Sequence, residues 1–262
     1  MNAPFRPSAM PSSAVEDYLK AIHRLQHESP GGRAGLGDVA RALGVTKGTV
    51  TTMSKRLAAD RLARYERYGG LTLTPRGEAA ALAVMRRHRI VETFLVDVLG
   101  LDWAEVHEEA ERLEHALSDA VLDRLDAFLG RPRLDPHGDP IPDAAGSMER
   151  SALRPLAACE PGMSARLVRV LDQEAAFLNF AATHGFRPGA RLHVRTRDAV
   201  AESMGVAIGT GEPITLALAA ALKFMVAVDP AEARAGREPQ ARSRRRVRGD
   251  APPAPRGAGR QR

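Results

Sequence analysis

The chain has 262 residues, of which 44% are hydrophobic, and a formal net charge of +6. This length predicts two or three domains with cores of their own, and no apolar run approaches the roughly 20 residues of a membrane-spanning helix. The single cysteine, Cys159, excludes an intrachain disulfide and a site built from several thiolates, so we expect a cytoplasmic protein.

The first part of the chain predicts a DNA-binding fold. Residues 1–12 have neither the basic start nor the apolar stretch of a signal peptide and are expected to be a disordered leader. In residues 13–75, the apolar spacing predicts a helix ended by SPGG, a short helix from Leu36 and a third helix over 47–59. Residues 63–73 then read as a hairpin that turns at Gly69-Gly70. This order is that of a winged helix-turn-helix.

Candidate DNA contacts lie on the outward face and at the start of the third helix. Short hydroxyl side chains and cations at a helix N-terminus suit the major groove, and Gly48 costs about 1 kcal/mol relative to alanine inside a helix. The predicted set is Thr46, Lys47, Gly48, Thr49, Thr51, Thr52, Lys55 and Arg56. On the hairpin, Tyr65, Arg67 and Tyr68 are expected to meet phosphates or the neighbouring groove.

Two further helices gather metal-binding groups. Thr74 and Pro75 predict the start of a helix that runs to about Leu99, and we expect one continuous helix over 103–129. The second helix has one apolar stripe through Val106, Ala110, Leu113, Leu117 and Val121, and a separate charged face. On each helix, histidines and glutamates lie in line with buried positions, where unpaired carboxylates need cations. These residues are His88, Glu92, His107, Glu111, Glu114 and His115.

The remaining chain contains a loop, a strand-rich unit and a basic tail. The glycines and prolines of residues 130–147 predict a linker, in which His137 is expected to be solvated. Residues 165–170 and 190–196 alternate as strands around a helix over about 174–184, and residues 203–218 read as a hairpin. Residues 229–262 hold ten arginines and four acidic residues, which predicts a disordered tail that is either simply solvated or adds nonspecific nucleic-acid affinity.

The segments MRRHRIVETFLVDVLGLDWAEVHEEAERLEHALSD and DPHGDPIP resemble the metal-binding and linker motifs of metal-dependent repressors of the diphtheria toxin repressor type. The resemblance runs from about residue 14 to residue 141 and continues more weakly to residue 228. It implies a mainly α protein with small β parts: a winged helix-turn-helix (13–75), a helical metal-binding and dimerisation domain with its linker (76–150) and an SH3-like, FeoA-like β-barrel domain (151–228). It also implies a homodimer that binds palindromic operators when loaded with Fe(II) or Mn(II) and represses metal-uptake genes.

The resemblance also implies which residues bind metal at each of two sites. It implies a primary site of Asp17, Glu111, Glu114 and His115, and an ancillary site of His88, Glu92 and His107, to which Glu174 is a candidate addition. Asp17 comes from the resemblance alone. Iron-sensing members carry Met and Cys at the positions of Asp17 and Glu111, so this chain is similar to the manganese regulators and Mn(II) is the expected cofactor, with Fe(II) as the alternative. Lys20 stands where some manganese regulators have Glu, which argues against a closely spaced two-metal cluster.

Two readings of another kind remain open at this stage. A catalytic di-metal centre needs an open coordination position, a substrate cleft and a positioned base, and the helix-turn-helix argues for a regulator rather than an enzyme. Alternatively, the carboxylates pair with arginines and the chain senses a small organic ligand. DNA binding that is insensitive to a metal chelator distinguishes this last reading from a metal sensor.

Overall fold

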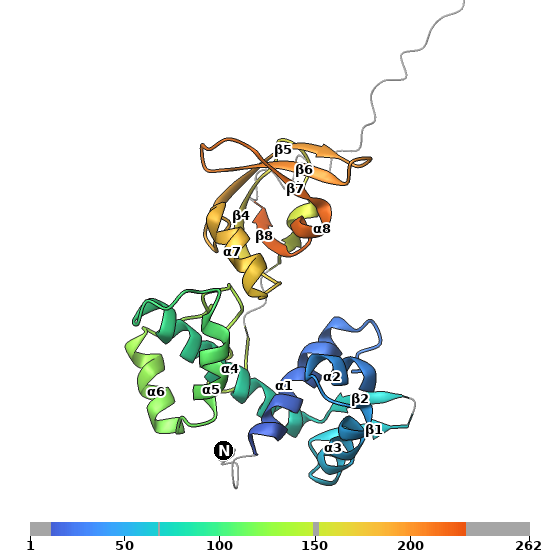
Figure 1. The fold of residues 1–262 in the computed structure, drawn as a ribbon. Coiled ribbons are helices and arrows are strands. Elements are labelled where there is room, and N and C mark those ends of the chain that lie inside the picture. Colours follow the sequence, from blue (N-terminus) through green and yellow to red (C-terminus); the bar gives the residue numbers. More distant parts are fainter. Residues whose placement is uncertain (1–11, 68, 149–151, 229–262) are drawn as a thin grey trace, which may run out of the picture.

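The computed structural model describes residues 12–67, 69–148 and 152–228. Figure 1 shows a helical N-terminal unit with a small hairpin, a second helical unit and a strand-rich C-terminal unit. The expected basic tail and the expected leader, apart from Ser12, lie outside the described residues, as does Tyr68 of the hairpin. None of the helices in the described part is both long enough and apolar enough to cross a membrane.

The N-terminal unit has the predicted order of elements. It consists of α1 (Ser13–Glu28), α2 (Leu36–Ala42), α3 (Lys47–Ala59) and the antiparallel pair β1 (Ala63–Glu66) and β2 (Gly70–Leu73). Thr46 caps α3, because its Oγ1 accepts a hydrogen bond of 3.2 Å from the amide of Thr49. Val39 of α2 and Val50 and Leu57 of α3 are fully buried in one core, which fixes the two helices against each other.

The second unit is built on the long helix α4 (Pro75–Asp97), followed by α5 (Val106–Glu114) and α6 (Asp119–Phe128). Thr74 caps α4 as predicted, through a hydrogen bond of 3.1 Å from the amide of Gly77 to its Oγ1. The prediction of one helix over 103–129 is wrong. Ser118 takes extended backbone angles and caps α6, so the helix is interrupted and His115 is the C-cap residue of α5.

The break also changes which apolar side chains are buried. Val106 and Ala110 are fully buried, whereas Leu113 is 42% exposed and Val121 is 43% exposed, so the predicted apolar stripe does not continue into the core. Exposed large apolar side chains are found at the end of α4, on α5 and on α6. They are Val98, Leu99, Leu113, Val121 and Phe128.

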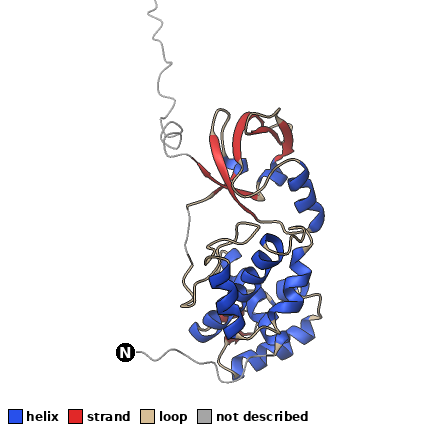
Figure 2. Cartoon of the chain, turned by 90° about the vertical axis from the view of Figure 1, so that its left-hand side faces the viewer, coloured by secondary structure: helices blue, strands red, loops and turns tan. Residues whose placement is uncertain are grey.

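The C-terminal unit is a six-stranded antiparallel sheet in the order β3-β8-β4-β5-β6-β7. Its elements are β3 (Arg154–Pro155), η1 (Leu156–Ala158), β4 (Ser164–Val170), α7 (Ala175–Thr183), β5 (Arg191–Asp198), β6 (Ser203–Ile208), β7 (Ile214–Ala217), α8 (Leu218–Ala221) and β8 (Phe224–Val228). The strands, the helix and the hairpin predicted here are all present. Figure 2 shows this sheet at one end of the described chain, above the helices.

The linker docks the C-terminal unit onto the helical unit. His137 accepts a backbone hydrogen bond of 2.9 Å from Val170 on β4. Gly138 has a φ of +86°, and a Cβ at this position would lie 1.8 Å from the carbonyl oxygen of Val168, so only glycine allows the approach. Trp103, which precedes α5, is buried in the core of the C-terminal unit. The expectation that His137 is solvated is wrong: its ring is fully buried and stacks on Trp103.

Candidate metal centre

The structure brings the four predicted primary-site residues together. Asp17 comes from α1, Glu111 and Glu114 come from α5, and His115 is the C-cap residue of α5. Each of the four offers a donor atom within 4.8 Å of the others. His115 Nε2 lies 3.3 Å from Asp17 Oδ1 and 3.5 Å from Glu114 Oε1. Glu114 is fully buried, whereas the other three side chains are partly exposed. The primary cluster, as we call these four residues, therefore joins the N-terminal unit to the second helical unit.

Lys20 places a cation inside the primary cluster. Its ammonium group contacts Glu111 and donates a hydrogen bond of 3.0 Å to Glu114 Oε1. Burial alone would lower the pKa of Lys20, but the two carboxylates outweigh burial and raise it. The lysine thus carries its charge, and it neutralises carboxylates that would otherwise repel each other.

Glu16 orients His115 and was not among the residues predicted from the sequence. It is 2% exposed, and its Oε2 accepts a hydrogen bond of 2.6 Å from His115 Nδ1. This leaves Nε2, on the other side of the imidazole, facing Asp17 and Glu114. Arg87 lies 3.4 Å from Glu16 Oε1 and balances the charge of this carboxylate. A histidine held by a carboxylate in this way is typical of metal sites.

The three predicted ancillary residues form a second cluster. His88 and Glu92 lie one turn apart on α4, and His107 faces them from α5. Glu92 Oε1 is 2.9 Å from His88 Nε2 and 3.3 Å from His107 Nδ1. His88 and Glu92 are buried, whereas the side chain of His107 is 45% exposed, which leaves a path from solvent. We call these three residues the ancillary cluster.

His88 connects the two clusters. Its Nδ1 donates a hydrogen bond of 2.5 Å to Glu114 Oε2, while its Nε2 faces Glu92. Burial opposes a charge on this ring, but Glu92 and Glu114 raise the pKa of His88 to about 9. Burial would likewise raise the pKa of Glu114, and the hydrogen bond from His88 reverses that effect and lowers it.

The residue considered as an ancillary ligand from the C-terminal unit does not reach the ancillary cluster. Glu174 is exposed at the start of α7 and does not join the ancillary cluster. Gln173 instead donates a hydrogen bond of 2.9 Å to Asp139, which is 3% exposed and also contacts Arg89 and Arg169. Phe177 packs against Phe224 in the sheet's core. The structure thus gives no support for Glu174 as an ancillary ligand, and the contact of Gln173 goes to Asp139, outside the ancillary cluster.

The donor atoms of the primary cluster fit a divalent cation. Burial, followed by the charges of Glu111 and Glu114, raises the pKa of Asp17, whereas His115 and Lys20 act in the opposite direction. Asp17 Oδ1 is buried and accepts no hydrogen bond within the described part of the chain. A buried carboxylate oxygen without a donor is costly, and three carboxylates with one imidazole form a set that hard divalent cations accept.

The predicted DNA-contacting residues share one face of the N-terminal unit. On α3, Lys55 and Arg56 and the residues from Thr46 to Thr49 are exposed, as is Thr52, while Thr51 is half-buried. The hydroxyls of Thr51 and Thr52 donate to carbonyl oxygens one turn earlier. Arg56 lies 3.9 Å from Asp60, a weak surface contact that leaves the guanidinium accessible.

Sequence comparisons match the three units to three known domains. Residues 10–71 match the N-terminal DNA-binding domain of iron-dependent repressors, and residues 74–143 match their metal-binding and dimerisation domain. Residues 154–228 match the FeoA domain. The iron-dependent repressor IdeR of Mycobacterium tuberculosis is 42% identical over 128 residues, which are 49% of this chain. The matched region spans only 55% of that protein's length.

Solved structures of similar proteins extend the likeness over most of the chain. A manganese-dependent transcriptional repressor in complex with manganese has a TM-score of 0.76 and 40% sequence identity, over 82% of this chain and 100% of its own. The IdeR of T. acidophilum has a TM-score of 0.67 and 30% identity, over 85% of this chain and 100% of its own.

Proposed function

Since the chain belongs to the diphtheria toxin repressor family of metal-dependent transcriptional repressors, we propose that it binds palindromic operator DNA as a homodimer when it is loaded with Mn(II), and so controls genes of metal uptake and homeostasis in the cytoplasm. Members of this family are repressors rather than enzymes. The metal ligands proposed are the primary cluster (Asp17, Glu111, Glu114 and His115) and the ancillary cluster (His88, Glu92 and His107).

One observation carries the proposal: the primary cluster has its ligands on both sides of the contact between α1 and α5. A bound divalent cation supplies positive charge among Asp17, Glu111 and Glu114. The side chains of this chain do the rest: Asp17 ties α1 to α5, and Glu16 holds His115 in place. Because α1 packs in the core that also holds α3, its position sets where α3 points. Metal affinity and DNA affinity are then linked and reciprocal.

The choice of Mn(II) rests on the hardness of the donors. Carboxylate oxygens with imidazole nitrogen suit a hard cation of high coordination number, whereas sulfur ligands suit softer ions. The primary cluster offers three carboxylates and one imidazole. Fe(II) is the second candidate, because the chain is 42% identical to repressors named for iron over the part that they share.

Homodimer formation is supported by the exposed apolar side chains at the end of α4, on α5 and on α6. The matching domain is one of dimerisation as well as metal binding. A palindromic operator fits such a pair, since two recognition helices must meet half-sites about 34 Å apart.

The experiment is a titration of DNA from upstream of the chain's own gene with the full chain, followed by fluorescence anisotropy, in Mn(II), Fe(II), Zn(II) or excess chelator. We expect specific binding only with metal, and at least a tenfold loss in Glu114→Ala and His115→Ala, because each change removes a ligand from the primary cluster. Glu109→Ala is the matched control, since Glu109 lies on the same helix, pairs with Arg112 and is absent from both clusters. Metal-free protein that binds this DNA equally well in chelator would overturn the proposal.

A further inference from the structure

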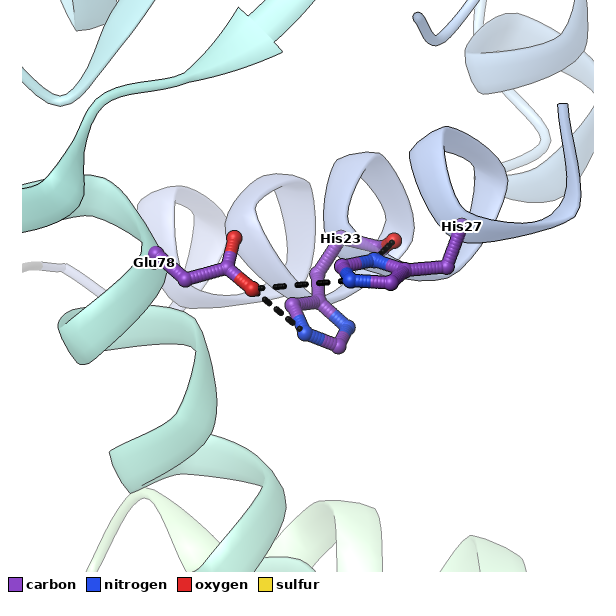
Figure 3. Close-up of side chains that lie close together, drawn as sticks. All are labelled: His23, His27 and Glu78. Carbon is purple, nitrogen blue, oxygen red and sulfur yellow. Dashed lines mark hydrogen bonds and ion pairs between the residues drawn. The ribbon is translucent and has the colours of Figure 1, made fainter. Parts of the chain in front are cut away.

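A further group of side chains that could hold a metal ion connects α1 with α4. His23 and His27 are one turn apart on α1, and Glu78 reaches them from the first turn of α4 (Figure 3). Glu78 Oε1 lies 3.0 Å from His23 Nε2 and 3.8 Å from His27 Nε2. None of these three residues belongs to the primary or the ancillary cluster.

The two imidazoles are oriented as ligands. His27 Nδ1 donates a hydrogen bond of 2.9 Å to the carbonyl oxygen of His23, so its Nε2 is left with a lone pair that faces Glu78. A metal-bound histidine ordinarily gives its other ring N–H to such an acceptor. His23 is 5% exposed, and its buried Nε2 makes no hydrogen bond in the described structure although Glu78 is within reach. Burial lowers the pKa of His23 and so favours its neutral ring, although the charge of Glu78 acts in the opposite direction.

The spacing of the donor atoms matches a small divalent cation. Ligands about 2.0–2.1 Å from a tetrahedral ion lie about 3.3 Å from one another. The two distances of 3.0 and 3.8 Å bracket this value. A plain hydrogen-bonded pair would account for one imidazole, but here two imidazoles converge on the same carboxylate oxygen.

Solvent can reach the site from one side. The side chain of His27 is 46% exposed and that of Glu78 is 30% exposed. All three residues also line a cavity of about 1070 Å³ that extends to Asp17, Glu111 and the ancillary cluster. A cation therefore has an entry path and room for a water ligand beside the three protein ligands.

We propose that His23, His27 and Glu78 form a further metal site that takes a borderline divalent cation, with Zn(II) preferred. Two imidazoles and one carboxylate are a usual zinc donor set, and they are softer than the carboxylate-rich primary cluster. Occupied, the site fastens the C-terminal half of α1 to the start of α4. It stands independently of the proposed regulatory function, because it shares no ligand with either cluster.

The test counts zinc in the full chain after equilibrium dialysis against Zn(II) buffered by a competing chelator. We expect His27→Ala and Glu78→Gln each to hold one zinc fewer per chain than the wild type. His184→Ala is the matched control: His184 also donates its Nδ1 to a carbonyl one turn earlier, but it belongs to none of the metal-binding groups in the described residues. It should keep the wild-type zinc content.

A second readout uses thermal melts of the same proteins with and without Zn(II). Zinc should raise the Tm of the wild type and of His184→Ala by the same amount. The rise should be smaller in Glu78→Gln, a substitution that preserves the shape of the side chain. Equal zinc content in wild type, His27→Ala and Glu78→Gln would overturn the proposal. Operator binding with Mn(II) is measured separately. If the regulatory proposal failed, operator binding would not depend on metal, while the zinc content of these variants would still differ.

Discussion

Asp17 and Glu111 are the proposed ligands that set the hardness of the primary cluster, because the family resemblance implies sulfur ligands at these two positions in iron-sensing members. Raw affinity rises from Mn(II) through Fe(II) towards Cu(II) in almost any mixed site, so selection must come from donor type and geometry. Zn(II) prefers four ligands and is expected to activate poorly even where it binds tightly.

We therefore expect Mn(II) to activate the wild type best. The double substitution Asp17→Met with Glu111→Cys should make Fe(II) or Co(II) at least as effective as Mn(II), because a thioether and a thiolate favour softer ions. The measurement is anaerobic operator binding against free metal concentration. A wild type that responds to Fe(II) at lower free concentration than to Mn(II), with equal maximal binding, would instead identify an iron regulator.

Lys20 competes with metal for the same carboxylates. Its ammonium group contacts Glu111 and Glu114, so Lys20→Met leaves them to repel each other until a metal arrives. We expect a tighter Mn(II) site in this variant, by about tenfold for each 1.4 kcal/mol of repulsion relieved, together with a lower Tm of the metal-free protein. Calorimetric titration with Mn(II) measures the first, and Lys55→Met is the control. Unchanged or weaker Mn(II) affinity would show that the lysine supports the site rather than blocks it.

At the scale of the helices, the sequence predicts those site residues that lie on one face of a single helix. His88 with Glu92, and His107 with Glu111, are four residues apart, so the period of a helix alone places each pair on one face. Asp17 meets His115 only through the packing of α1 on the second unit, which no local pattern encodes, and it came from family resemblance. Glu16 was missed for the same reason. His137 was misjudged because a loop has no period from which burial can be read.

The interruption between α5 and α6 also went unpredicted, although its signal is local. Ser118 caps α6 in the structure. In the sequence, however, apolar residues at helical spacing continue on both sides of Ser118, and this pattern predicts a single helix. In the structure, the side chain of Leu113 on α5 is 42% exposed.

We expect Leu113→Glu to prevent dimerisation, because it places a charge in an apolar surface that a second chain would bury. Sedimentation should then give half the mass of the wild type, with operator affinity reduced at least tenfold. Val200→Glu is a suitable control, since Val200 is 97% exposed on the C-terminal unit. A dimer of unchanged stability in Leu113→Glu would place the interface elsewhere.

At the scale of the whole molecule, Asp139 holds the C-terminal unit to the helices. This buried carboxylate contacts Arg89 of α4, Arg169 of β4 and Gln173. Asp139→Asn removes the counter-charge of Arg169 and one of the two carboxylates beside Arg89, which keeps Asp135 as a partner. Breaking a fully buried pair costs about 3–5 kcal/mol, and the cost here should lie at or below the lower end of that range because the Arg169 side chain is 36% exposed. We expect urea denaturation to show a loss of that order, and hydrogen exchange to speed up in β4. Asp143→Asn, a change at an exposed position, should alter neither the stability nor the exchange rate. Equal stability of Asp139→Asn and Asp143→Asn would argue that the contacts of Asp139 do not hold the C-terminal unit to the helices.

The hydrogen bond between His88 and Glu114 has a consequence for how sharply a cell would switch its genes. Each residue is a proposed ligand of a different cluster, so a cation at the ancillary cluster holds His88 with its Nδ1–H directed at Glu114, and Glu114 is then already in position for the primary cluster. The first ion lowers the ordering cost for the second. The dose–response curve of such a sensor is steeper than the hyperbola of a single site, so transcription changes over a narrow range of metal supply rather than drifting across a wide one.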